Sequence, residues 1–222
     1  MTIEIAFKIF ANPLDNTYQS VCIVAMKTPE ETKQHIIRAA APVFNKKGYA
    51  GTSLSDVLEM TRLTKGAIYH HFANKDELAI AALEYNLNLV SLYSFKAIKD
   101  RPHSCDKLAA FAGSFRKNYN SLKQIGGCPV VNAAIDSDDG NEQIRRRVTR
   151  FLSIWKKTLM QIIEEGRSKG EIRPEIDTEA FSMNLISLIE GSIAMSRVSD
   201  DRRFVDNAVD LAKSLIDEIR KG

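Results

Sequence analysis

The sequence predicts an all-α protein in which short helices come first and long helices follow. Beyond residue 28, apolar residues recur every three or four positions, as the 3.6-residue repeat of an amphipathic helix requires. Ser, Thr or Asn residues stand just before several of these stretches, where their side chains can cap the first helical turn. No segment after residue 28 has a convincing strand pattern.

The composition is that of an ordinary globular protein. A chain of 222 residues with 44% hydrophobic side chains can form one large domain, or a small domain joined to a larger one. No apolar run approaches the roughly 18 residues of a membrane span, so we expect a soluble protein without a membrane partner. The net charge of +3 permits a nucleic-acid partner without requiring one. Residues 26–76 hold eight Lys or Arg against five Asp or Glu, so the basic excess lies mainly there.

The cysteines give no sign of a disulfide framework or a zinc site. Cys22, Cys105 and Cys128 are odd in number, widely spaced and without a CxxC pair. We therefore expect a cytoplasmic protein without a metal or another cofactor.

Residues 1–25 differ from the rest of the chain. Alternating apolar residues in "TIEIAFKIF", a turn-rich "NPLDN" and a β-rich "YQSVCIVA" are compatible with a small hairpin. Glu4, Lys8 and Asp15 interrupt any apolar segment long enough for a secretory signal. We interpret residues 1–25 as an N-terminal extension, a hairpin or disordered, that contributes little to function.

The first predicted helix begins after Thr28. Its apolar residues, including Ile36, Ala40 and Phe44, follow helical spacing, and Gly48 stops it after two lysines. Two short helices follow. Ser53 and Asp56 form a capping-box-like start for one that ends near Thr61, and the other begins at Thr64 and runs toward Phe72.

Two short helices separated by about three residues are typical of a helix-turn-helix. A helix that enters the major groove of DNA needs small or hydrogen-bonding residues in its first turn, so that the backbone can approach the base edges. Thr64, Lys65, Gly66 and Ala67 meet this requirement.

Side chains that can donate to DNA phosphates flank this turn, and the helix N-termini add free N–H groups. The candidates are Thr52, Ser53, Ser55, Tyr69, His70 and Lys75. Tyr69 is expected to point outward because Ile68 and Phe72 occupy the inward face, whereas His70 either contacts a phosphate or is simply exposed. His70 and His71 lie about 100° apart on a helix, so they do not form a metal site.

The remainder of the chain predicts long amphipathic helices. Asn74 and Glu77 cap the next one, and three more apolar stripes follow, at residues 144–162, 181–195 and 204–219. Small residues near the C-terminus would suit a close helix seam between two subunits or an internal packing face. They are Gly191, Ser192, Ala194 and Ser196.

The segments "ETKQHIIRAA" and "FNKKGYAGTSLSDVLEMTRLTKGAIYHHFANKDEL" strongly resemble the DNA-binding region of the TetR family of bacterial transcriptional repressors, over roughly residues 30–76. The resemblance implies a three-helix DNA-binding head, at residues 26–76, and a helical body at residues 77–222. It also implies that the body binds an unknown small-molecule inducer, that a homodimer forms through the last two helices, and that the partner is a double-stranded DNA operator. "SKGEIRPEIDTEA" is also similar to the body of that family.

Two residues depart from the family pattern. Pro42 lies inside the first helix, where we expect a bend, since an internal proline costs about 3 kcal/mol in an unadapted helix. Arg62 stands at a turn position where the family often has Gly. A positive φ there would cost about 1 kcal/mol, which a contact between Arg62 and a phosphate would offset.

The candidate ligand-binding residues of the body are mostly aromatic, and each is also compatible with a plain core position. They are Phe111, Phe115, Tyr119, Cys128, Trp155 and Met183. Cys128 has no adjacent base to activate it as a nucleophile, so a buried thiol is expected, and the resemblance suggests that its segment borders the ligand cavity.

The sequence therefore predicts a ligand-responsive repressor and not an enzyme. Three alternatives remain open: an activator of the same fold, a dimer that binds ligand but no DNA, and a helical enzyme that uses Cys128 or the histidines.

Overall fold

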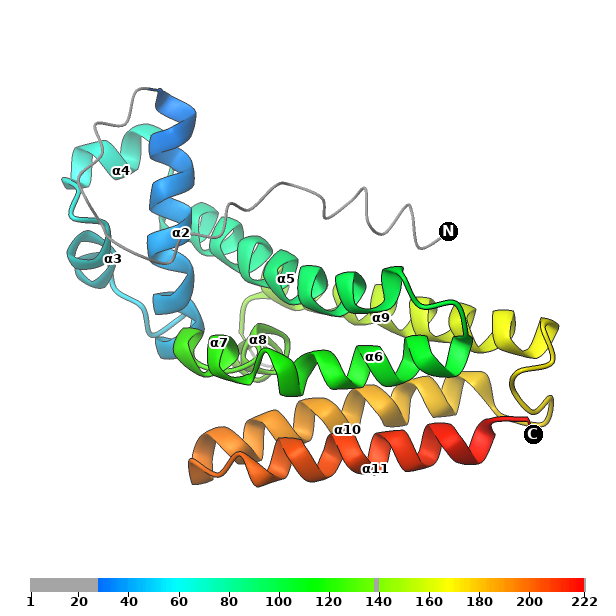
Figure 1. Ribbon diagram of the computed structural model, residues 1–222. Helices are drawn as coiled ribbons and strands as arrows, with labels where there is room; N and C mark the ends of the chain where they lie inside the picture. The colour runs from blue at the N-terminus through cyan, green and yellow to red at the C-terminus, as the bar shows by residue number, and fades with distance from the viewer. Residues whose placement is uncertain (1–27, 138–139, 222) are drawn as a thin grey trace.

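The computed structural model describes residues 28–137 and 140–221, and the predicted extension at residues 1–25 lies outside them. The described residues form α-helices and no strand, which confirms the predicted fold class (Figure 1). The helices are α2 (Pro29–Lys47), α3 (Leu54–Thr61), α4 (Lys65–His71), α5 (Lys75–Lys99), α6 (Ser104–Lys117), α7 (Tyr119–Ile125), α8 (Pro129–Ser137), α9 (Glu142–Ser168), α10 (Thr178–Ser199) and α11 (Arg203–Ile219). None of these helices is long and apolar enough to cross a membrane.

Side-chain caps fix the start of each helix near the N-terminus. Thr28 and Glu31 form a capping box at α2, and Ser53 and Asp56 form the predicted one at α3. The hydroxyl of Thr64 accepts from the backbone N–H of Ala67 at α4. These local hydrogen bonds stabilise short helices that would otherwise be marginal.

The helix α2 continues through Pro42 to Lys47, so the proline does not end it. Phe44, two residues later, is fully buried, and the side chain of Asn86 on α5 donates to the carbonyl of Ala41 at 2.9 Å. Packing against α5 therefore stabilises this part of α2 and offsets the hydrogen bond that Pro42 removes.

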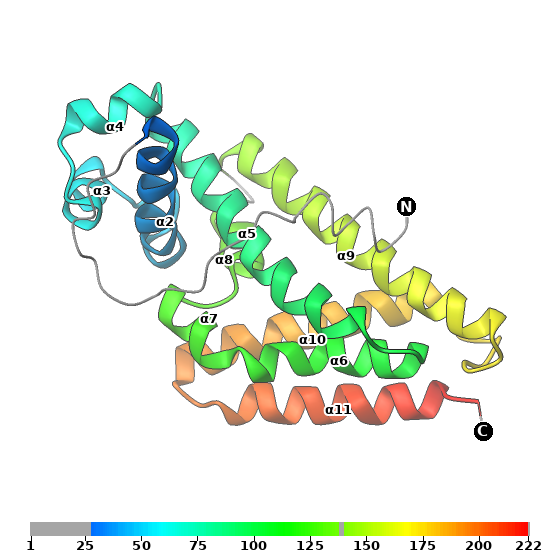
Figure 2. The same cartoon turned by 45° about the horizontal axis from the view of Figure 1, so that its top comes forward.

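Figures 1 and 2 show α2, α3 and α4 gathered at one end of the molecule, with the other helices forming an elongated body. The helix α5 extends from the head into the body, and α10 and α11 run side by side along one edge. The core of the body holds a cluster of aromatic rings from α6 and α9. Trp155 packs edge-on against Phe111 and Phe115, with ring centroids 5.5 and 5.7 Å away.

A second contact joins the head to the body at the C-terminal end of α2. The buried side chain of Asn45 donates to the carbonyl oxygens of Ile125 and Gly127, at 2.8 and 3.1 Å. Asn132 on α8 donates to the backbone carbonyl of Asn45 at 3.1 Å. Because amide groups buried without partners are costly, this network fixes the last turn of α2 against the loop between α7 and α8.

Gly166 on α9 is required by close packing. A Cβ atom there would lie 2.7 Å from Ile172 Cδ1 and 2.7 Å from Ser104 Cβ. We expect Gly166→Ala to lower the free energy of unfolding by about 1–3 kcal/mol, since overpacking forces its neighbours to move. Gly113→Ala on α6 is the matched control because a Cβ there meets no atom within 4 Å. It should stabilise the protein by about 0.5–1 kcal/mol through helix propensity. Urea unfolding of both variants measures the difference, and equal stabilities would contradict the packing assignment.

Candidate nucleic-acid interface

The turn between α3 and α4 contains a residue with positive φ, which the sequence had only made possible. Arg62 has φ 56° and ψ 27°, in the left-handed region, and its N–H donates to the carbonyl of Leu58 at 2.9 Å. The strain expected for a non-glycine residue is therefore present, at about 1 kcal/mol. The Arg62 side chain is exposed. The turn directs α4 across α3, which gives the predicted helix-turn-helix.

The inner face of α4 is anchored and its outer face is free. Ile68 on α4 and Phe72 just after it are each only 2% exposed. On the other side, Lys65, Gly66 and Tyr69 are exposed, and a Cβ added to Gly66 would meet no atom within 4 Å. Lys65 Nζ lies 5.7 Å from the ring centroid of Tyr69. Thr64 and His70 are also exposed and Ala67 is half-buried, so the first turn of α4 is open to a large partner.

Two of the predicted phosphate donors use their hydroxyls inside the protein. Thr52 is 1% exposed and donates to the carbonyl of Gly48 at 2.7 Å. The prediction for the Thr52 hydroxyl is wrong, because this hydroxyl closes the turn before α3 and does not reach the surface. Ser53 is exposed, but its hydroxyl accepts from the N–H of Asp56 and donates to that carboxylate as the cap of α3. Ser55 is exposed.

Lys75 has a structural role that the sequence did not indicate. Its Nζ donates to the carbonyl oxygens of Thr52 and Ala50, at 2.8 and 3.3 Å. An ammonium has three donors, so one remains for a phosphate. Lys75 therefore attaches the start of α5 to the loop that precedes α3.

The adjacent histidines of α4 contact each other. The rings of His70 and His71 meet edge-on with centroids 5.0 Å apart. The described residues contain no group of three or more His, Cys, Asp or Glu side chains that could hold a metal ion.

The one carboxylate at the start of α3 is held in an ion pair. Lys47 Nζ lies 2.5 Å from Asp56 Oδ1, and the hydroxyl and N–H of Ser53 donate to the other oxygen. The hydrogen bond from Lys47, followed by those from Ser53, lowers the pKa of Asp56 to about 2. Its negative charge is thus matched by a lysine of α2.

Comparison with known proteins agrees with this geometry. Residues 36–82 match the family model for bacterial regulatory proteins of the tetR family, and residues 104–212 match the tetracyclin repressor-like C-terminal domain. A TetR transcriptional regulator from Chloroflexus aurantiacus J-10-FL is 33% identical, with a TM-score of 0.85 over 89% of this chain and 100% of that one. A TetR family regulator from Cytophaga hutchinsonii is 34% identical, with a TM-score of 0.82 over 92% of this chain and 100% of that one. The chain belongs to the TetR family of transcriptional regulators.

A curated relative from Mycobacterium sp. (strain GP1), named HTH-type transcriptional repressor DhaR, is 22% identical over 81% of this chain and 88% of its own length. Members of the TetR family are DNA-binding regulators and not enzymes, and ligand-responsive repression is typical of them. The enzyme alternative therefore does not apply to this chain.

The six candidate ligand residues of this TetR-family regulator do not form one pocket. Phe111, Phe115 and Trp155 form the aromatic core cluster described above. Tyr119 is half-buried at the α6–α7 junction, where its hydroxyl accepts from Ser196. Met183 is 50% exposed on α10, so it lies outside the buried core of the subunit, and its role as a ligand-binding residue stays a prediction. These residues come from several different helices, and the sequence pattern of each helix does not specify how the helices pack against one another.

Cys128 is buried, as expected, but its partner was not predicted. Its Sγ donates to Glu190 Oε1 at 3.2 Å, and burial raises the pKa of Glu190 to about 7. Glu190 is the only charged residue between Phe181 and Met195. A single charged residue in an apolar stretch could have indicated that Glu190 is buried. Burial also raises the pKa of the Cys128 thiol, which disfavours the reactive thiolate.

The ion pair of Asp56 makes the head sensitive to acid. Because the folded pKa is about 2 and the unfolded one is about 3.9, its stabilisation is present above pH 4 and is lost as the pH falls toward 2. Asp56→Asn removes this carboxylate, so the variant should lose less stability than the parent over that range. Urea unfolding at several pH values measures the difference. Glu59→Gln, an exposed residue on the same helix, is the control, and matching profiles for Asp56→Asn and the parent would contradict the assignment.

Proposed function

We propose that this regulator is a homodimeric repressor that binds operator DNA through α4 and releases it when a small molecule binds the body. The observation that carries the proposal is the open first turn of α4, where Gly66 has no neighbouring atoms and Lys65 and Thr64 are exposed. A helix presented in this way fits the major groove, where side chains contact base edges. The repressor name of the mycobacterial relative supports the direction of regulation.

The proposed DNA contacts divide into two sets. Thr64, Lys65, Gly66 and Ala67 approach the base edges. Residues that contact phosphates fix the register of α4 in the groove and carry little sequence information. These are Ser55, Arg62, Tyr69, His70 and the remaining donor of Lys75.

Gly66→Phe tests whether the backbone of α4 approaches DNA. The side chain has room in the free protein, so the variant should fold, but it would hold α4 away from the groove. Operator affinity should fall toward the non-specific level, about 10³-fold or more. Gln161→Phe on the body is the control because Gln161 is exposed on α9, away from α4. Binding to operators selected from a random DNA pool, measured by fluorescence anisotropy, gives the affinities. Unchanged affinity for Gly66→Phe would refute the proposed interface.

The proposed dimer forms through an exposed apolar face on α10 and α11. Large apolar side chains lie on the outer side of both helices, away from the core. They are Met183, Met195 and Val198 on α10, and Phe204 and Leu211 on α11. Several large apolar side chains exposed on two neighbouring helices favour an interface, and a twofold axis would pair this face with itself.

The sequence left two roles open for the small residues of α10, namely packing inside the subunit and packing between subunits. The residues divide between these two roles. Ser192 and Ser196 are buried and pack inside the subunit. Gly191 is exposed, a Cβ there meets no atom within 4 Å, and Ala194 is half-buried. We assign the exposed Gly191 to the seam between subunits, where a small residue lets two helices approach closely.

Gly191→Arg should convert the dimer to a monomer without unfolding the subunit. The free subunit has space for the side chain, but a dimer would have to bury an unpaired guanidinium, which is costly. Size-exclusion chromatography with light scattering measures the mass of each variant, and Gln161→Arg at an exposed position on α9 is the control. A Gly191→Arg protein that stays dimeric would place the interface elsewhere.

We propose that the inducer binds among the aromatic rings of the body, which comprises residues 77–222. Trp155 Nε1 is buried and has no hydrogen-bond partner among the described residues. An unpaired buried donor is available to a ligand acceptor. Because Trp155 is the only tryptophan of the chain, its fluorescence reports directly on this cluster.

A ligand shifts the protein toward one conformation only if it binds that conformation more tightly. The hydrogen bonds of Asn45 with Ile125 and Gly127 connect the body to α2, so they offer a route from the ligand to the head. Selection of DNA from a random pool with and without candidate metabolites tests the whole proposal. Failure to enrich any site would favour a dimer without DNA binding, and reporter expression in a deletion strain separates repression from activation.

A further inference from the structure

A surface hollow lies between α6, the start of α7 and α11, away from the helix-turn-helix. Its volume is about 380 Å³, which is within the usual range of small-molecule sites. Its lining includes Arg116, Lys117, Tyr119, Arg202, Val209 and Lys213. No Asp or Glu side chain of the described residues lines it.

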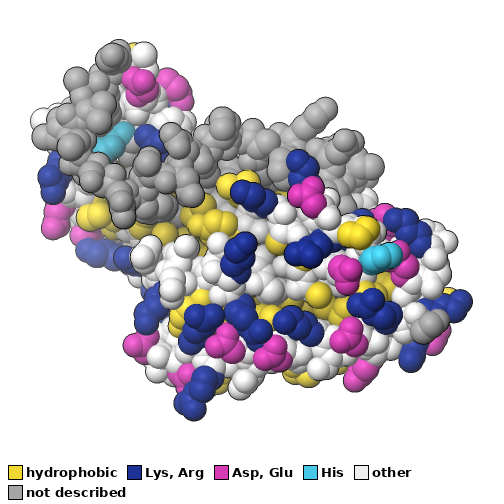
Figure 3. All heavy atoms as spheres, viewed as in Figure 1, with side chains coloured by type: hydrophobic (Ala, Val, Ile, Leu, Met, Phe, Trp, Pro, Cys, Tyr) yellow, Lys and Arg dark blue, Asp and Glu magenta, His cyan; other side chains and the backbone are white. Residues whose placement is uncertain are grey.

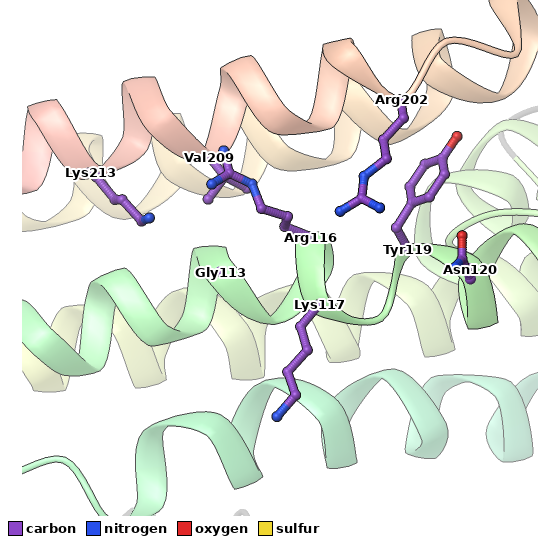
Figure 4. A pocket seen from close by; sticks show the side chains of 8 residues that line it. All are labelled: Gly113, Arg116, Lys117, Tyr119, Asn120, Arg202, Val209 and Lys213. Carbon is purple, nitrogen blue, oxygen red and sulfur yellow. The ribbon is translucent and has the colours of Figure 1, made fainter.

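Cationic groups converge on this hollow from two elements. Figure 4 shows Arg116 on α6 and Arg202 at the start of α11 reaching into the space between the helices, with Lys213 on α11 at its edge. Lys117 points away from α11. Figure 3 shows other Lys and Arg side chains on this face of the molecule, interspersed with Asp and Glu.

The acidic partners only partly balance these cations. Asp206 is shared by Arg116 and Arg202, at 3.1 and 3.3 Å. Asp210 is shared by Arg116 and Lys213, at 2.8 and 4.0 Å. Two carboxylates therefore serve three cations, which leaves a local excess of positive charge beside the hollow.

The donors of Arg116 are also incompletely used. Its Nε is buried and lies 3.1 Å from Asp206 Oδ1, yet it makes no hydrogen bond of acceptable geometry among the described residues. Its Nη2 donates to the backbone carbonyl of Asp206. A guanidinium has five N–H donors, so Arg116 has capacity for a further acceptor.

One wall of the hollow is apolar and planar. The guanidinium of Arg202 lies over the Tyr119 ring, 5.5 Å from its centroid, and the side chain of Val209 completes the lining on α11. Stacking holds the Arg202 guanidinium in place, and a fixed guanidinium binds carboxylate or phosphate oxygens with defined geometry.

We propose that this hollow binds a small organic anion that carries carboxylate or phosphate groups. Arg116 and Arg202 hold the anionic groups, and Lys213 adds charge at the entrance. The carbon skeleton of the ligand contacts the half-buried ring of Tyr119. This site differs from the aromatic cluster around Trp155, and binding to it does not depend on the proposed repressor function.

The proposed dimer leaves the hollow accessible. Lys213 follows Leu211 by two residues, which places the two side chains about 200° apart around α11. The apolar face that contains Leu211 and the hollow that contains Lys213 therefore lie on different sides of the helix. An anion can enter whether the protein is a monomer or a dimer.

Isothermal titration calorimetry of the full-length protein tests the proposal with citrate as the carboxylate probe and pyrophosphate as the phosphate probe. Sodium chloride keeps the ionic strength constant, and glucose is the uncharged probe. We expect saturable binding of one anion per subunit and none of glucose. Arg202→Gln and Lys213→Gln should each weaken binding, by about tenfold for the arginine, since a charge-assisted hydrogen bond is lost.

Arg203→Gln is the matched control because Arg203 is the neighbouring residue, is 84% exposed and pairs with Asp201 outside the hollow. It should bind like the parent. Binding of citrate alone or of pyrophosphate alone supports the site and identifies the anionic group. The proposal is overturned if neither anion binds, if glucose binds equally well, or if Arg202→Gln and Arg203→Gln have the same affinity as each other.

Discussion

The anchoring of α4 by its inner face is the constraint on which the rest of the molecule depends. A seven-residue helix is too short to be stable alone in water. Ile68 and Phe72, each 2% exposed, bury this helix against the head and contribute roughly 1.5–3 kcal/mol apiece. Because all of the apolar contact lies on one side, the other side is left to Lys65, Gly66 and Tyr69. The face of α4 that stabilises the head is thus opposite the face that is proposed to contact DNA.

The head needs a fixed position as well as a fixed shape. The helix α5 runs continuously from the head into the body, and Asn45 attaches the far end of α2 to the loop between α7 and α8. Two attachments fix the orientation of the head relative to the body, whereas a single attachment would allow the head to rotate. Any rearrangement near α7 or α8 therefore acts on α2 directly, which gives a physical basis for control of DNA binding from the body.

The residues of the body show how much of a binding site a sequence pattern can predict. Aromatic residues at helical spacing did identify a real cluster around Trp155. The same pattern also included Tyr119 and Met183, which the packing of α7 and α10 places at a surface junction and on an exposed face. The pairing of Cys128 with Glu190 joins residues 62 positions apart, so helical periodicity had no means of predicting it.

The sequence by itself determined α2 to α5 and α9 to α11, the caps of α3, α4 and α5, and the identity of the helix-turn-helix, but it did not predict α6, α7 or α8. Capping and amphipathic periodicity depend on residues within about four positions of one another, so they can be recognised in the sequence before the tertiary structure is known. Only the tertiary structure decided which polar groups face outward. Thr52 and Lys75 have the chemistry of phosphate contacts, yet they bond to Gly48 and to the loop before α3. Folding buries Thr52 and brings the loop at residues 50–52 close to Lys75, so the availability of each donor depends on contacts that the local sequence does not specify.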